Sequence, residues 1–168
     1  MAREQNIKLA LDNFGRYVVR ESKKNLRNNT ASGSLARSIR FESSVAKNSF
    51  SLNIEMNDYG EYLDQGVSGT QKKYDTPYKY TNKMPPASAF SQWVVRKGLD
   101  GVRDKKTGRF IKRKSLQFAI AKSIQKKGIK PTKFFTRPFN LAFDKLPKEI
   151  VTAFELNKAD FKAFSKKK

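Results

Sequence analysis

Apolar residues near the N-terminus recur with the period of an α-helix. They are separated by four, three and four positions, which places their side chains on one helical face: Ile7, Leu11, Phe14 and Val18. The sequence therefore predicts an amphipathic helix over residues 3–27, which the polar run at 28–33 brings to an end.

The pattern changes to a period of two after Gly33. Apolar and polar residues alternate over residues 39–45 and again over 50–56, as expected for strands with one buried face. Between the two runs, residues 47–49 (Lys-Asn-Ser) supply side chains typical of a turn. The sequence thus predicts an antiparallel β-hairpin.

A long segment with few aliphatic residues follows, from Val67 to Ala87. Connections of this length in a small domain are usually functional or disordered. Two helices are expected after it, one capped by Ser88 and ending at Gly98, the other running from Ser115 to about Lys127. Their buried residues are predicted to be Phe90, Trp93 and Val94 in the first helix, and Leu116, Ile120 and Ile124 in the second.

Glycine marks the end of both helices, at Gly98 and Gly128. In each case the next residue and the residue four positions before the glycine are apolar, which is the pairing of a Schellman motif. Lysine or arginine also fills the last turn of each helix, where a cation is favourable. We therefore expect a left-handed glycine cap at both positions.

Aromatic and aliphatic residues recur in the chain beyond Pro131. They predict one broken helix or two short ones, because Pro147 interrupts a helical spacing. The residues are Phe134, Phe135, Phe139, Phe143, Leu146, Ile150 and Phe154. For the first three, packing in a core is favoured over stacking on nucleic-acid bases, because their spacing continues the helical seam.

This order of elements predicts a single α+β domain over residues 1–160. The expected order is an N-terminal amphipathic helix, an antiparallel hairpin, a long loop inserted at about 67–114, and two to three helices. A basic tail, residues 161–168, completes the chain.

Charge is the most unusual feature of the composition. The chain has 36 Lys and Arg residues against 15 Asp and Glu, a formal net charge of +21, and 13 Phe among its 168 residues indicate that it nevertheless folds. Residues 96–133 contribute +12 of that charge. The residues predicted to face DNA or an acidic partner are Arg96, Lys97, Arg103, Lys105, Lys106, Arg109, Lys112, Arg113 and Lys114.

At the level of sequence, phosphate binding by this basic patch carries about the same weight as the alternative interpretation, a solvated surface or a patch that binds an acidic protein. Dense positive charge attracts phosphate without a recognition motif, and it attracts an acidic protein surface in the same way. No zinc-finger, homeodomain or RNA-recognition motif accompanies the patch, so readout of a specific base sequence is not expected.

Histidine and cysteine are both absent, which excludes imidazole and thiolate catalysis, His or Cys metal sites and disulfides. Enzymes that use only Asp, Glu, Lys or Tyr remain possible. Asp58, Glu61 and Asp64 form an acidic group that could hold a metal in a nuclease, but charge pairing or docking is the favoured interpretation. Residues 1–10 do not resemble a secretory leader, and no apolar run is long enough for a membrane helix.

Three short motifs suggest a family. Residues 60–70, Gly-Glu-Tyr-Leu-Asp-Gln-Gly-Val-Ser-Gly-Thr, are preceded by Ser-Gly-Ser-Leu-Ala-Arg-Ser-Ile at 32–39 and followed by a Pro-x-x-Phe segment at 131–134. In this layout the chain resembles the tail-completion or neck proteins of tailed bacteriophages, including minor-tail-protein-Z-like members. The motif and interface candidates are Tyr62, Asp64, Gly66, Gly69, Phe134 and Phe135. The resemblance covers about residues 5–155, and residues 71–114 depart from the shorter family members.

The resemblance implies a structural virion protein without catalysis, which joins head to tail. We accordingly expect no cofactor and no metal. Such a subunit assembles into a ring of six or twelve copies around a DNA channel and contacts the portal or adaptor and the tail proteins. It would reside in the neck or tail region of the virion, and in the host cytoplasm during assembly. The alternative function from another class is a free protein that binds nucleic acid without sequence preference.

Overall fold

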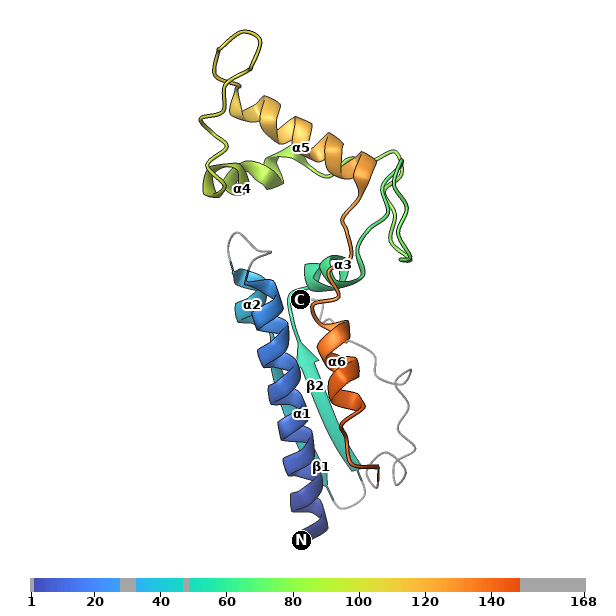
Figure 1. The fold of residues 1–168 in the computed structure, drawn as a ribbon. Helices are drawn as coiled ribbons and strands as arrows, with labels where there is room; N and C mark the ends of the chain where they lie inside the picture. The colour runs from blue at the N-terminus through green and yellow to red at the C-terminus, as the bar shows by residue number, and fades with distance from the viewer. Residues whose placement is uncertain (1, 28–32, 47–48, 149–168) are drawn as a thin grey trace. The chain divides into compact units, whose positions relative to one another are not determined.

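The computed structural model describes residues 2–27, 33–46 and 49–148 of the chain. Helices and a two-stranded antiparallel sheet give the described residues the α+β class that the sequence predicted. Figure 1 shows the elements in chain order: α1 (Ala2–Leu26), α2 (Ser34–Ser38), β1 (Arg40–Ala46), β2 (Ser49–Glu55), α3 (Tyr59–Gln65), the 3₁₀-helix η1 (Ala87–Phe90), α4 (Ser91–Arg96), α5 (Arg113–Lys127) and α6 (Thr136–Phe143).

Two compact units divide this chain. Unit 1 contains the described residues up to Gly60 and from Lys133 onward, and unit 2 is Glu61–Thr132. Unit 2 therefore contains the segment at about 67–114 that the sequence set apart as an insert in a single domain. The predicted tail, residues 161–168, lies outside the described residues.

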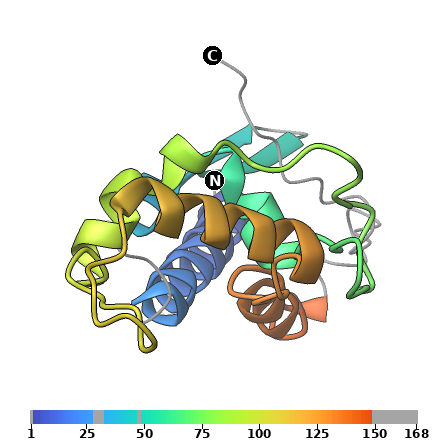
Figure 2. The same ribbon diagram turned by 90° about the horizontal axis from the view of Figure 1, so that it is seen from above.

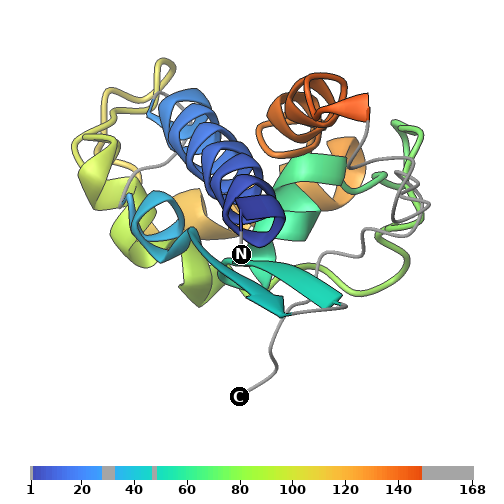
Figure 3. The ribbon, with the colours of Figure 1, turned by 90° about the horizontal axis from the view of Figure 1, so that it is seen from below.

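The core of unit 1 is built on α1, the predicted N-terminal helix. All four apolar positions of its predicted face are buried, and the same seam continues to Leu26. The sheet lies on one side of α1 and α6 on another (Figure 3), and both pack against it. The spacing of apolar residues thus identified the buried face of α1 correctly.

The sheet has the alternation that the sequence predicted. Phe41 pairs with Ile54, and Val45 with Phe50, so their half-buried side chains share one face. On the other face of β1, Arg40, Glu42 and Ser44 are exposed. The ring of Phe41 occupies the space that a Cβ atom on Gly15 of α1 would take. Glycine at this point of the helix therefore lets strand β1 approach closely.

A short helix, α2, precedes the sheet, in a segment to which the sequence analysis assigned no element. Its Leu35 is buried, as is Ile39 directly after it. The hydroxyl of Ser38 donates to the Leu35 carbonyl and accepts from the Asn57 backbone N–H at 3.0 Å. A helix of five residues is too short to produce a recognisable apolar period, which explains why the pattern did not reveal it.

The C-terminal part of unit 1 completes its core. Phe134, Ala142 and Leu146 are buried, and the ring of Phe139 meets that of Phe14 edge to face at 5.4 Å between centroids. Core packing of these aromatic residues was the favoured prediction, and the structure confirms it. Helix α6 ends at Phe143; Ile150 and Phe154, which were expected to continue the seam, lie outside the described residues.

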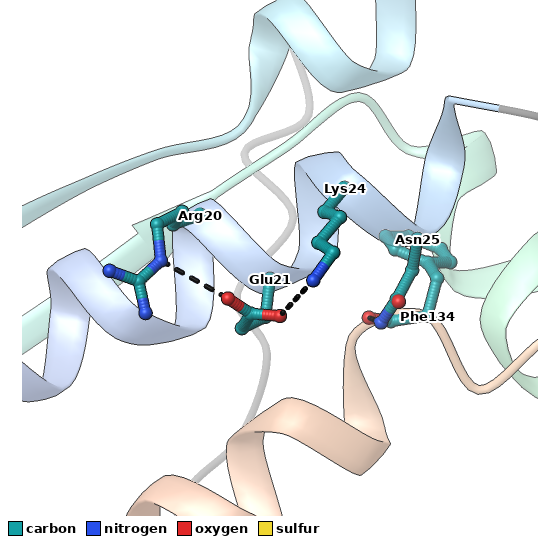
Figure 4. Close-up of polar contacts among 5 residues, drawn as sticks. All are labelled: Arg20, Glu21, Lys24, Asn25 and Phe134. Atoms are coloured by element: carbon teal, nitrogen blue, oxygen red, sulfur yellow. Dashed lines mark hydrogen bonds and ion pairs between the residues drawn. The ribbon is translucent and has the colours of Figure 1, made fainter.

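Polar contacts at the end of α1 reinforce this packing (Figure 4). The side-chain amide of Asn25 donates to the Phe134 carbonyl at 3.2 Å, while Glu21 accepts from Arg20 at 3.1 Å and lies 3.9 Å from the Lys24 ammonium. The Asn25 contact ties together two segments that lie 109 positions apart in sequence.

In unit 2, the long connection after α3 is held by hydrogen bonds to Ser68. The Ser68 backbone N–H donates to the Tyr78 carbonyl, and its carbonyl accepts from Tyr80 N–H, both at 2.8 Å. Its hydroxyl donates to the Tyr74 carbonyl at 3.1 Å and accepts from Tyr74 N–H at 3.0 Å. One buried serine thus organises a segment for which the sequence predicted no regular structure.

The first helical segment of unit 2 differs in part from its prediction. Instead of one helix capped by Ser88, the 3₁₀-helix η1 leads into α4, and Trp93 is 38% exposed while Val94 is buried. Both elements pack against α5, as Figures 1 and 2 show. The end of α4 is the predicted Schellman motif: Gly98 has φ +64°, its N–H donates to the Val95 carbonyl, and Leu99 N–H donates to the Val94 carbonyl, each at 2.9 Å.

Helix α5 begins at Arg113, two residues before the predicted start, and its buried residues are Gln117 and Ala121. The predicted buried residues, at positions 116, 120 and 124, are only half-buried. The face is rotated because α5 packs on η1 and α4, elements whose positions local sequence does not encode.

The end of α5 also differs from its prediction. Gly128 has φ +72° and its N–H donates to the Ile124 carbonyl, but Ile129 N–H donates to Val67 at 2.8 Å rather than back to the helix. The expected Schellman motif is therefore wrong at this position. The chain leaves α5 by pairing Ile129 with Val67, and this long-range pairing replaces the second capping bond.

Candidate functional site

Basic side chains are concentrated in unit 2. It holds 17 Lys and Arg residues against five Asp and Glu, a net charge of +12. All nine basic residues that the sequence singled out belong to this unit, and all nine are exposed. They follow one another at the end of α4, in the loop that joins α4 to α5 (yellow in Figure 1), and at the start of α5.

Few ion pairs with carboxylates neutralise these nine basic residues. Within the residues that the structure describes, Arg113 is the only one of the nine with an ion pair, at 3.8 Å from Asp100. The other eight leave their charge to the solvent or to a partner. Surface charges of this kind contribute little to stability, so the fold does not explain their number.

The loop between α4 and α5 contains a small hairpin, residues 102–111, which we call the basic hairpin. Arg103 and Phe110 form an antiparallel bridge. Backbone hydrogen bonds join Asp104 N–H to the Arg109 carbonyl at 2.8 Å and Ile111 N–H to the Val102 carbonyl at 3.0 Å. The sequence predicted only a long inserted loop at about 67–114, and the structure forms this hairpin within it.

The turn of the basic hairpin is organised by Asp104. Its carboxylate oxygen Oδ1 accepts from the backbone N–H of Thr107 at 2.8 Å, from that of Lys106 at 2.9 Å and from the Thr107 hydroxyl at 3.1 Å. The hydrogen bonds from Thr107 and Lys106 lower the pKa of Asp104, because they favour its charged form. Gly108, with φ +67°, closes the turn by donating to the Asp104 carbonyl at 2.8 Å.

Arg103 lies across the basic hairpin. Its guanidinium carbon is 4.1 Å from the centroid of the Phe110 ring, and its Nη1 donates to the Gly108 carbonyl at 3.1 Å. Phe110 is 62% exposed, the most exposed of the large apolar residues in the described chain. A stacked and hydrogen-bonded guanidinium is fixed in direction, unlike the flexible ammonium groups of the neighbouring lysines.

The start of α5 is electrostatically unfavourable. Lys112, Arg113 and Lys114 stand at the positive end of the helix dipole, the first turn contains no acidic residue, and Lys112 makes no side-chain capping hydrogen bond. Each cation at such a position costs roughly 0.3–1 kcal/mol. The electrostatics of the helix therefore disfavour cations at these positions.

Tyr62, one of the motif residues, belongs to an aromatic contact on α3. Its ring meets the Tyr78 ring edge to face at 4.6 Å. The Tyr78 hydroxyl donates to the Glu61 carboxylate at 2.6 Å, and this hydrogen bond raises the pKa of Tyr78 to about 12. Glu61 and Tyr62 therefore hold the long connection against α3.

Gly66 and Gly69, two further motif residues, allow two backbone segments to approach each other. A Cβ atom on Gly66 would lie 2.7 Å from the Ile129 carbonyl oxygen, and one on Gly69 would lie 2.5 Å from the Gly128 nitrogen. Glycine at these two positions therefore serves the close approach of the two backbone segments. The remaining motif residue of this run, Asp64, is buried on α3.

The acidic group is not assembled into a metal site. Asp58 is exposed, Asp64 is buried, and Glu61 accepts hydrogen bonds from Tyr78 and from Gln65. No three carboxylate side chains lie together so as to hold a metal ion in the described part of the chain. The described helices also include none that is long and apolar enough to cross a membrane.

Phe134 and Phe135, the last two motif candidates, belong to the core of unit 1. Phe134 is 1% exposed, and Phe135 packs against the cluster around Phe14 and Val18. They lie outside unit 2 and its basic surface.

Sequence reasoning missed the exposed aromatic residues beside the basic ones. Trp93 was expected in the core, and Phe118 of α5, which is 51% exposed, was not singled out. Lys122 and Lys126 are exposed on the same helix, four positions apart. Their spacing was available in the sequence, whereas the exposure of the aromatic rings depends on how α4 and α5 pack.

Comparisons with protein-family models, with curated proteins and with solved structures find no match to this chain.

Proposed function

We propose that the protein is a structural, non-enzymatic subunit of a tailed-bacteriophage neck, a ring-forming head–tail connector or tail-completion protein around the DNA channel. The observation that carries the proposal is the exposed basic surface of unit 2, of whose nine predicted residues eight have no ion pair in the described chain. The resemblance of residues 32–39, 60–70 and 131–134 to neck proteins supports it.

The exposed charge of this surface suits the kind of binding that a DNA channel requires. DNA must pass through without being held at one sequence, so phosphate attraction suits the task and base readout does not. The basic hairpin and the start of α5 present charge in this form, with no motif for base recognition. Closure into a ring of six or twelve copies requires two different, complementary interfaces on each subunit.

The partners in this proposal are further copies of the chain, the portal or adaptor, the tail proteins and the genomic DNA. The protein would occupy the neck or tail region of the virion, after assembly in the host cytoplasm. Mass spectrometry of purified particles, with electron microscopy of the protein alone and with neck partners, tests this. A fixed low copy number and ring particles are expected; absence from virions together with persistent monomers would contradict the proposal.

A second candidate function is a free protein that binds nucleic acid without sequence preference. The net charge of +12 on unit 2 favours it. This candidate predicts tight binding by the monomer that weakens steeply with salt. Weak binding at about 0.15 M salt would exclude it.

A further inference from the structure

We infer that the basic hairpin is a preorganised phosphodiester-binding finger in which Arg103 makes the principal contact and Phe110 positions it. This inference rests on the proposed function, since it names the group on unit 2 that grips the DNA backbone. It goes beyond diffuse attraction, because it assigns one oriented guanidinium a larger part than the more numerous lysines beside it.

The orientation of Arg103 is fixed by two contacts. The guanidinium carbon lies over the Phe110 ring, 4.1 Å from its centroid, and Nη1 donates to the Gly108 carbonyl at 3.1 Å. Together these two contacts restrain the orientation of the guanidinium. The rotamer freedom of a long side chain is therefore largely lost before a ligand arrives, which lowers the entropic cost of binding.

The remaining donors of Arg103 are available to a ligand. Among the described residues, Nε and Nη2 have no acceptor within hydrogen-bond distance, and Arg103 has no ion pair. The nearest carboxylate in sequence, Asp104, is occupied by the hydrogen bonds from residues 106 and 107 that close the turn. Two adjacent N–H groups of a planar guanidinium match two oxygens of a phosphodiester.

The surrounding charge selects a polyanion as the occupant. Lys105, Lys106 and Arg109 belong to the same hairpin as Arg103, are exposed and make no ion pair in the described chain. They raise the local concentration of phosphate by long-range attraction, whereas Arg103 supplies the directional contact. Duplex DNA presents such oxygens along its whole length, so the finger can engage it at any register.

The test separates the contribution of side-chain charge to DNA affinity from that of the guanidinium geometry of Arg103, and it uses the full-length protein. Binding to duplex DNA of mixed sequence is measured for wild type and for three variants, with thermal melting as a control for folding. Arg103→Lys keeps the charge but loses the planar fork, and we expect about a tenfold loss of affinity. Phe110→Leu keeps all charges but removes the stacking surface, and we expect about a threefold loss.

Lys105→Gln is the matched control on the same hairpin. It removes a full charge and leaves the Arg103 guanidinium unchanged, and we expect about a twofold loss of affinity. The inference therefore predicts that a substitution that keeps the charge costs more than one that removes it. If wild type binds DNA and Arg103→Lys binds as well as wild type, the finger is overturned while the proposed function stands.

Two further outcomes are distinguishable. If wild type itself does not bind duplex DNA, the proposed DNA contact fails, and the finger fails with it. Binding to polyglutamate serves as the arm for an acidic protein partner. If Arg103→Lys weakens polyglutamate binding as strongly as DNA binding, the fork recognises carboxylates equally well, and the assignment to phosphodiesters is overturned.

Discussion

Gly98 and Gly128 both end a helix with positive φ, but the physical reasons for glycine differ. Around Gly98 there is open space, with no atom within 4 Å of a Cβ position. At Gly128 a Cβ atom would overlap the Val67 carbonyl oxygen and lie 2.6 Å from the Gly69 nitrogen. Backbone conformation alone demands glycine at the first position, whereas backbone conformation and close packing both demand it at the second.

We predict different costs for alanine at these two positions. Gly98→Ala should lower the free energy of unfolding by about 1 kcal/mol, the penalty of a left-handed residue. Gly128→Ala should lower it by about 3 kcal/mol or more, because two backbone segments must also separate. Urea unfolding of both variants checks this, and equal losses would show that the segments separate without cost.

Ser22 is a second residue whose surroundings give a prediction. It lies on the seam of α1 between Val18 and Leu26, is fully buried, and its hydroxyl has no hydrogen-bond partner among the described residues. Ser22→Ala removes an unsatisfied polar group, so we expect an unfolding free energy higher by up to about 1 kcal/mol. A clear loss of stability in chemical denaturation would show that the hydroxyl has a partner.

At the scale of elements, local pattern succeeded where an element is long or has a regular alternation. Helix α1 and the two strands have enough residues for a period to be recognised, and their buried faces follow it. Helices α2 and α3, of five and seven residues, have too few. Helix α5 was found, but its buried face was not, because Gln117 and Ala121 face η1 and α4 through tertiary packing.

The basic hairpin should respond to acid through Asp104. Its pKa is lowered from an ordinary value of 3.8, so the carboxylate stabilises the turn fully above that pH, and the stabilisation is lost as pH falls through the lower pKa of the folded form. We predict that the backbone amides of Lys106 and Thr107 lose protection from hydrogen exchange in this acid range.

Asp104→Asn provides the control for this titration. An asparagine carbonyl can accept the same hydrogen bonds but does not titrate, so the hairpin should then show little change over the same range. An identical acid response in wild type and Asp104→Asn, measured by NMR, would mean that other groups control the turn.

At the scale of the whole molecule, the exposed charge of unit 2 is the feature that stability does not explain. Arg113 has a carboxylate partner, but the cations at the start of α5 oppose the helix dipole. A surface that local energetics disfavours is consistent with a role in binding an anion.

Removing this charge should separate folding from function. We predict that replacing Arg109, Lys112, Arg113 and Lys114 together by serine leaves the melting temperature unchanged or slightly higher, because these side chains contribute little to stability or oppose the dipole. DNA retention or particle assembly should be impaired. Normal particles with normal DNA content from such a mutant would show that the patch is incidental.

The sequence by itself determined the α+β class, the buried face of α1, the strand alternation, the glycine cap at Gly98 and the concentration of positive charge. Each of these follows from residue periodicity, from one residue's conformational freedom or from composition, which are local properties. Only the tertiary structure decided that Ile129 pairs with Val67, that α5 buries a different face from the predicted one, and that the Arg103 guanidinium lies over the Phe110 ring. These features depend on contacts between segments distant in sequence or on the path of a turn, and no periodicity encodes them.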